Sequence, residues 1–133
     1  MRGSETILVV EDYAEVRALA LSGLAGLGYS VHGASSGKEA LAFCREFAGP
    51  IHLVVTDVVM TDMNGREVAN QVSQVRPDAR ILFMSGYTAD VIAHHGVLDA
   101  GVEYLQKPFT PECLAQKVRE VLGSRTDTSH GAG

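Results

Sequence analysis

The chain has 133 residues, of which 46% are hydrophobic and 20% are charged, a composition typical of one soluble domain with its own core. Its net charge of −5 and its scattered basic residues argue against direct binding to nucleic acid or to an anionic membrane. No apolar run approaches the roughly 20 residues of a membrane span, and the first residues lack the layout of a signal peptide, so we expect a cytoplasmic protein.

Apolar, strand-like runs alternate with helical patterns along the whole chain. Strands are predicted over residues 6–10, 29–34, 51–55, 81–84 and 102–106. The first helical pattern follows Glu11 and Asp12 and closes near Gly28. The second begins at Ser36, which has capping-box spacing to Glu39, and ends before the Gly-Pro pair at 49–50.

Later helices are marked in the same way. Asn64 caps a third helix that ends at Pro77, and a weaker helical pattern covers residues 87–98. Thr110, followed by a proline, caps a last helix that runs to Leu122. The tail has no apolar periodicity, so we predict a folded domain over residues 1–122 and a flexible tail over 123–133.

Five strands alternating with helices predict an α/β fold, a doubly wound parallel sheet with helices on both faces. In such a sheet, ligands bind outside the carboxyl ends of the strands, where the strand order reverses. The side chains that follow strands are therefore the candidate site residues. They are Glu11, Asp12, Asp57, Ser85 and Lys107.

Three of these side chains are carboxylates, which repel one another. At about 4 Å the repulsion is roughly 4 kcal/mol per pair for an effective dielectric constant near 20, so a bound cation is implied. Oxygen ligands with positions left for water and a phosphoryl group suit Mg²⁺, or the similar ion Mn²⁺. Asp57 beside such an ion can act as a nucleophile and form an acyl phosphate, while Lys107 and Ser85 stabilise the transferred charge.

Cysteine and histidine offer simpler interpretations. Cys44 and Cys113 each lie within an apolar helical pattern, which favours reduced, buried thiols over a disulfide or a reactive site. The five histidines lack metal-ligand spacing, and the adjacent pair at 94–95 points in different directions on a helix. We therefore expect no histidine metal site.

The ordered landmarks resemble the receiver domain of two-component response regulators over roughly residues 5–122. They are Glu11-Asp12, Asp57 in Thr-Asp-Val-Val-Met, Ser85 in Met-Ser-Gly-Tyr, Tyr104, and Lys107 in Lys-Pro-Phe. The resemblance implies a flavodoxin-like (βα)5 fold with strand order 2-1-3-4-5, and phosphorylation of Asp57 by the phosphohistidine of a histidine kinase.

The same resemblance implies a role for each site residue. Asp12, Asp57 and the backbone carbonyl of Val59 would hold Mg²⁺, and Glu11 would act largely through water. Ser85 and Lys107 would contact the phosphoryl group. Tyr104 would be the rotating aromatic of a switch that changes the face formed by the fourth helix, the fifth strand and the fifth helix.

The sequences of segments 5–12, 81–88 and 105–111 are most similar to those of receivers at the C-terminus of hybrid sensor histidine kinases. We therefore expect the chain to be either a fragment of such a kinase or a stand-alone receiver. Partners would be a histidine kinase, in cis or in trans, or a phosphotransfer protein, and the domain would be a monomer or weak dimer. Thr61 stands where the family commonly has proline, which leaves the order of that loop open.

Three other functions fit a fold of this kind. The first is a receiver-like interaction module that works without phosphorylation, against which the intact acid, serine and lysine set argues. The second is a metal-dependent phosphatase with an aspartyl nucleophile, which would carry Asp-x-Asp after the first strand. The third is a flavin carrier, whose first turn would be rich in hydroxyls and glycine instead of Glu11-Asp12.

Overall fold

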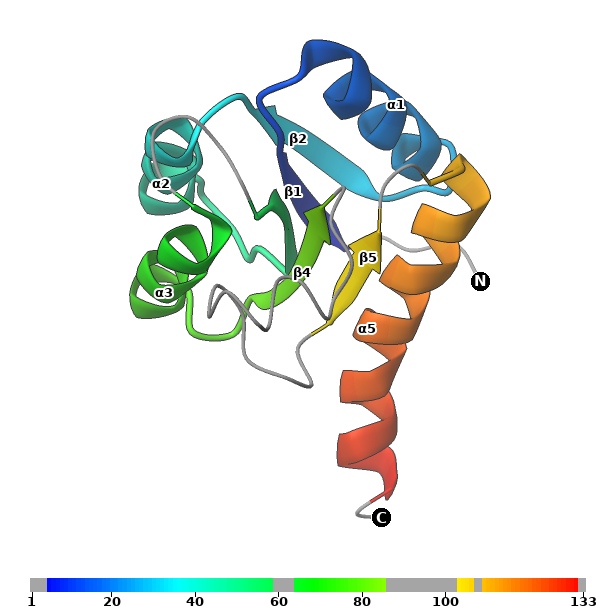
Figure 1. Cartoon of the computed structure of the whole chain (residues 1–133). Coiled ribbons are helices and arrows are strands. Elements are labelled where there is room, and N and C mark those ends of the chain that lie inside the picture. The colour runs from blue at the N-terminus through cyan, green and yellow to red at the C-terminus, as the bar shows by residue number, and fades with distance from the viewer. Residues whose placement is uncertain (1–4, 59–63, 86–102, 107–108, 132–133) are drawn as a thin grey trace, which may run out of the picture.

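The computed structural model describes residues 5–58, 64–85, 103–106 and 109–131, with side chains of the last helix described up to residue 123. Its strands are β1 (Thr6–Val10), β2 (Ser30–Ala34), β3 (Leu53–Asp57), β4 (Arg80–Ser85) and β5 (Tyr104–Gln106). They form one parallel sheet in the order β2-β1-β3-β4-β5 (Figure 1). This order confirms the predicted flavodoxin-like fold.

Helices cover both faces of the sheet. The described helices are α1 (Ala14–Ala25), α2 (Gly37–Glu46), α3 (Gly65–Val75) and α5 (Pro111–Gly131). Helices α1 and α5 lie on one face, and α2 and α3 lie on the other (Figure 1). The predicted helix over 87–98 lies outside the described residues.

The central strand β1 is buried on both faces. Ile7 and Val9 belong to the core beneath α1 and α5, whereas Leu8 and Val10 belong to the core beneath α2 and α3. All four side chains are fully buried, which explains why the run is apolar without alternation. The next polar side chains after this apolar run therefore come where β1 ends, at the edge of the sheet.

Side-chain caps fix where the helices begin. Asn64 Oδ1 accepts a hydrogen bond from the Glu67 N–H (2.9 Å), and Glu67 Oε1 accepts one from the Asn64 N–H (3.1 Å), which completes a capping box. Ser36 and Thr110 each accept an N–H from three residues further on. The predicted starts of α2, α3 and α5 are thus confirmed.

Helix α5 is longer than predicted. The expected end at Leu122 is wrong, because the helix continues to Gly131 and its last turns extend past the sheet (Figure 1). No proline follows Leu122, so backbone hydrogen bonds can continue after the apolar pattern has ended. The division of the chain at residue 122 stays a prediction. No helix among the described residues is both long enough and apolar enough to cross a bilayer.

The two cysteines are free, but only one is buried. Cys44 packs in the core beneath α2 and α3, as predicted. The predicted burial of Cys113 is wrong, because the neighbouring Leu114 takes the inward position on α5 and leaves Cys113 exposed. Burial raises the pKa of the Cys44 thiol, and the nearby Arg76 and Arg45 lower it by less.

Arg76, at the C-terminal end of α3, fastens α3 to α2. Its guanidinium donates hydrogen bonds to the carbonyl oxygens of Cys44 (2.8 Å), Gly49 (2.6 Å) and Phe47 (2.5 Å). These carbonyls lie at the end of α2 and in the loop that follows, where helix carbonyls lack partners within the helix. One side chain therefore holds the C-terminus of α2 and the chain that leads into β3.

Replacing this side chain should weaken the fold measurably. We expect Arg76→Met to lower the free energy of unfolding by about 2 kcal/mol, because three carbonyls lose a charged donor. Urea denaturation followed by circular dichroism measures the change. Arg45→Met is the matched control, since Arg45 is exposed on α2 and its replacement should stay within about 0.5 kcal/mol. Equal effects of the two substitutions would contradict the role given to Arg76.

The two thiols should differ sharply in reactivity. In native protein, a thiol-specific reagent should modify Cys113 promptly and Cys44 slowly, because burial covers Cys44 and its raised pKa keeps the thiol protonated. Mass spectrometry of the labelled protein counts the modified thiols over time. In urea, both should react. Equal labelling rates in native protein would show that Cys44 is not buried.

Candidate functional site

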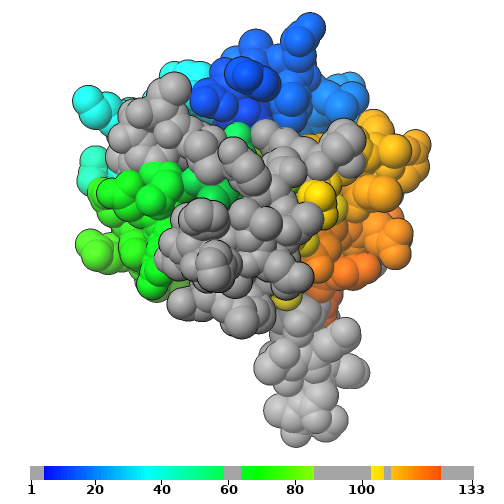
Figure 2. All heavy atoms as spheres, in the orientation of Figure 1, coloured from blue at the N-terminus to red at the C-terminus, as the bar shows by residue number. Residues whose placement is uncertain are grey.

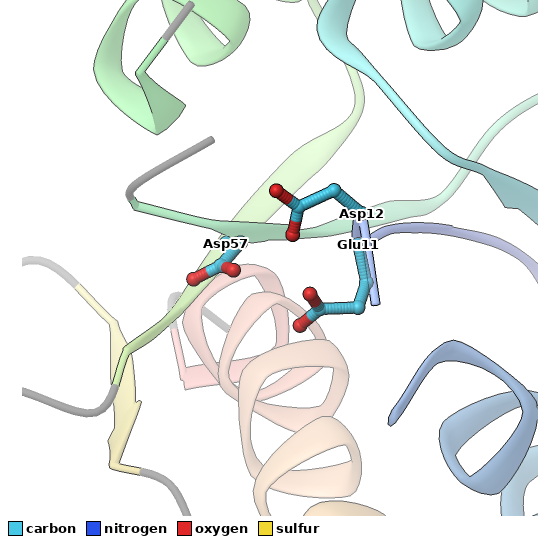
Figure 3. Close-up of side chains that lie close together, drawn as sticks. All are labelled: Glu11, Asp12 and Asp57. Atoms are coloured by element: carbon cyan, nitrogen blue, oxygen red, sulfur yellow. The ribbon is translucent and has the colours of Figure 1, made fainter. Parts of the chain in front are cut away.

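Three carboxylates meet at the carboxyl edge of the sheet. Glu11 directly follows β1, Asp12 comes next, and Asp57 is the last residue of β3. One carboxylate oxygen of each lies within 4.8 Å of the other two, and Figure 3 shows the three side chains converging. Strands β1 and β3 are paired in parallel with Val10 opposite Thr56, so the residues after them emerge side by side. The predicted convergence of these acids is confirmed.

The carboxylates are shielded to different degrees. Glu11 is fully buried and Asp57 is 7% exposed, whereas Asp12 is half-buried. Asp12 thus lies on the solvent side of the group, and a ligand would approach from there. Uncharged or apolar side chains could fill this edge at lower electrostatic cost, so the acids point to a ligand that carries positive charge.

The donor set fits a hard divalent cation. All three residues offer carboxylate oxygens. Within the part of the chain that the structure describes, no cysteine or histidine joins this group of potential metal ligands. Oxygen ligation by few protein groups is what Mg²⁺ favours, because it retains several waters or takes phosphate oxygens in their place. The residues present therefore fit a Mg²⁺ ion held by carboxylate oxygens at the ends of two neighbouring strands.

A glycine lets α3 start directly against the backbone of Asp57. The Gly65 N–H donates a hydrogen bond to the Val58 carbonyl oxygen (2.7 Å). A Cβ atom at position 65 would lie 2.4 Å from the Asp57 carbonyl oxygen, which is closer than atoms can pack. Gly65 therefore fixes the backbone that carries Asp57. This role was not predicted from the sequence, where the only signal is a glycine directly after the Asn64 cap.

Ser85 lies at the same edge of the sheet, at the end of β4. In the register of β3 and β4, Asp57 pairs with Met84, so Ser85 is one residue further toward the carboxyl end. Ser85 is 2% exposed, and its predicted place beside the acids is consistent with this position. The Val58 N–H donates to the Met84 carbonyl oxygen (3.0 Å), which ties the end of β3 to β4.

Tyr104 connects β5 to the end of β4. Its hydroxyl donates a long hydrogen bond to the Ser85 carbonyl oxygen (3.5 Å), and its ring packs on the small cluster of Val58, Ala69 and Phe83. Burial raises the pKa of the Tyr104 hydroxyl, and the hydrogen bond with Ser85 lowers it by less. The hydroxyl therefore remains a neutral donor throughout the physiological pH range.

Two predicted site residues lie outside the described residues. They are Val59, predicted to offer its carbonyl to the metal, and Lys107, predicted to pair with the phosphoryl group. Thr61, the departure from the family pattern, also lies there. Their roles stay predictions.

Removing one charge from the acidic group should stabilise the metal-free protein. In chelator, we expect Asp57→Asn to raise the free energy of unfolding by about 1 kcal/mol, because two repulsive contacts are relieved while the shape is kept. Adding Mg²⁺ should stabilise the unmodified protein more than the variant, because binding to the folded state adds to stability. Thermal melts with and without Mg²⁺ measure both effects. A variant less stable than the unmodified protein in chelator would contradict charge crowding at this site.

Comparison with known proteins gives a consistent result. The sequence model of the family described as response regulator receiver domain matches residues 7–119. The sensor kinase CckA of Brucella abortus is 40% identical over 122 residues, which are 92% of this chain but 13% of that protein. The response regulator receiver protein CpdR of the same organism is 29% identical, over 87% of this chain and 95% of CpdR.

Solved structures agree with the sequence matches. The receiver domain of the hybrid histidine kinase CckA superimposes with a TM-score of 0.74 at 34% identity, covering 88% of this chain and 98% of that one. The chain thus spans 13% of the length of the sensor kinase CckA and 95% of the length of CpdR.

Proposed function

The chain belongs to the response regulator receiver domain family, and from this membership we propose that Asp57 accepts a phosphoryl group from the phosphohistidine of a histidine kinase. The observation that carries the proposal is the grouping of Asp57 with Glu11 and Asp12 within 4.8 Å at the carboxyl edge of the sheet. Asp57 is fixed in place by its pairing with Met84 of β4 and by the hydrogen bond from Gly65, at the start of α3, to the next residue, Val58.

The transfer is a displacement at phosphorus. An oxygen of the Asp57 carboxylate attacks the phosphorus atom, the bond from phosphorus to the imidazole nitrogen breaks, and the electron pair stays on that nitrogen. The products are an acyl phosphate on Asp57 and a histidine free for another cycle. Water can later attack the acyl phosphate and return the domain to its starting state.

Glu11, Asp12 and Asp57 are the residues that would hold Mg²⁺, together with the predicted carbonyl of Val59. When bound, Mg²⁺ neutralises the acids and draws phosphoryl oxygens toward Asp57. The chain's own contribution is to bring Asp57 and Asp12 to the same edge from two strands, and to keep Glu11 buried next to them.

Ser85 and Tyr104 are the proposed reporters of phosphorylation. The new phosphoryl oxygens are acceptors that the Ser85 hydroxyl and Lys107 can reach if the ends of β4 and β5 move inward. Tyr104 already bonds the Ser85 backbone, so a shift of Ser85 changes the position of Tyr104. The surface that includes β5 and α5 then differs between the two states, which is what a partner could distinguish.

Receiver domains interact with histidine kinases or phosphotransfer proteins, and we propose such a partner here, in cis or in trans. The match to sensor kinase CckA favours a kinase-linked receiver, whereas the match to CpdR along nearly its whole length favours a stand-alone one. Both arrangements use the same chemistry at Asp57.

A small acyl-phosphate donor tests the phosphoacceptor proposal without knowledge of the kinase. With Mg²⁺ and acetyl phosphate, the intact protein should gain the mass of one phosphoryl group, and Asp57→Asn should gain none. Asp78→Asn is the matched control, because Asp78 is exposed in the turn before β4 and should leave phosphorylation intact. If the protein gains no mass, or if Asp57→Asn gains it equally, Asp57 is not the phosphoacceptor.

A further inference from the structure

We propose that Arg17, on α1, is a positioning residue that sets the Mg²⁺ affinity of the acidic site by holding the backbone of Glu11. The proposal rests on the proposed function, since it concerns the ion that phosphorylation of Asp57 needs. Arg17 Nη1 donates a hydrogen bond to the carbonyl oxygen of Glu11 (2.7 Å), which is short and charge-assisted.

The turn that carries the acids is held at three points. The Glu11 N–H donates to the Ala34 carbonyl oxygen (3.0 Å), and the Tyr13 N–H donates to Glu11 Oε2 (3.0 Å). Arg17 supplies the third contact, on the carbonyl side of Glu11. That carbonyl belongs to the peptide group that leads into Asp12. The rotation of this peptide affects where the Asp12 carboxylate points, so Arg17 acts on Asp12 through the backbone.

Gly33 of β2 makes room for this arginine. A Cβ atom at position 33 would lie 3.2 Å from Arg17 Cδ, 3.5 Å from Arg17 Cγ and 2.9 Å from Leu21 Cδ1. The aliphatic part of Arg17 therefore runs across β2 at the one residue that has no side chain. Both close neighbours are flexible side chains, so a methyl group at Gly33 displaces Leu21, which is nearer, and Arg17 more than it disturbs the strand.

If Arg17 acted only through its charge, its replacement would change the Mg²⁺ affinity in the opposite direction from the one expected for a positioning residue. Removing a cation near a metal site should tighten Mg²⁺ binding by Coulomb's law, whereas removing the contact to Glu11 should weaken it. The sign of the effect therefore separates the two. Residues that orient metal ligands typically change metal affinity by about 10-fold or more when they are replaced.

Calorimetric titration with Mg²⁺ is the primary test. Arg17→Met, which keeps the aliphatic stem, should raise the Kd for Mg²⁺ about 10-fold, and Arg17→Lys should recover part of the affinity. Arg45→Met, exposed on α2, is the control and should leave the Kd unchanged. At saturating Mg²⁺, Arg17→Met should still be phosphorylated on Asp57. Unchanged or tighter Mg²⁺ binding in Arg17→Met would overturn the proposal.

Gly33→Ala tests the path of the side chain independently. On its own, Gly33→Ala should also raise the Kd for Mg²⁺, but by a smaller factor than Arg17→Met. In an Arg17→Ala background it should have no further effect, because the stem that it displaces is gone. Additive effects of the two substitutions would show that Gly33 does not act through Arg17.

Hydrogen exchange in chelator separates this proposal from the proposed function. The Tyr13 amide, bonded to Glu11 Oε2, should exchange faster in Arg17→Met than in the unmodified protein, with no metal present. If the unmodified protein binds no Mg²⁺, the proposed function fails, while faster exchange still supports the contact as a positioning one. If neither the exchange rate nor the Mg²⁺ affinity changes in Arg17→Met, the role of Arg17 is refuted and the proposed function of Asp57 still stands.

Discussion

The repulsion among three carboxylates is the constraint on which the rest of the domain depends. Glu11, Asp12 and Asp57 are forced together because β1 and β3 are neighbours in a parallel sheet whose central strand is buried on both faces. The apolar packing of α1 and α5 on one side and α2 and α3 on the other provides the stability that holds like charges in place. Like charges gathered in this way favour a bound cation, which would link ion binding to the stability of the fold.

The surroundings of the acids restrict the backbone as much as the side chains. Gly65 places the start of α3 against the Asp57 carbonyl, and Arg17 reaches the Glu11 carbonyl across Gly33. In both cases a residue without a side chain allows a close approach next to an acid. Figure 2 shows this side of the molecule in the orientation of Figure 1, with atoms of α1 in blue at the top, α3 in green on one side and α5 in orange on the other.

Much of this arrangement could be predicted from sequence, for physical reasons. Apolar runs that end in acids mark buried strands, and the carboxyl-edge rule for parallel sheets then brings Glu11, Asp12 and Asp57 together. Local capping chemistry located the start of α3 at Asn64. The errors arose where no local signal exists. The end of α5 depends on backbone bonding without an apolar face, and the exposure of Cys113 depends on which neighbour faces the core. The path of Arg17 over Gly33 depends on how α1 crosses β2.

The Arg76 contact gives the domain an uneven stiffness. Arg76 joins the end of α3 to the end of α2 and to the loop that follows α2, so these two helices are linked to each other. At the β5 edge of the sheet, the Tyr104 hydroxyl meets the Ser85 carbonyl through a long, uncharged hydrogen bond, and the Tyr104 ring packs on a cluster that includes Ala69 of α3. A displacement of the edge that carries Asp57 would therefore meet more resistance from α2 and the end of α3 than from β5. If Asp57 is phosphorylated as proposed, an arginine remote from the acids would thus limit the directions in which the domain can deform.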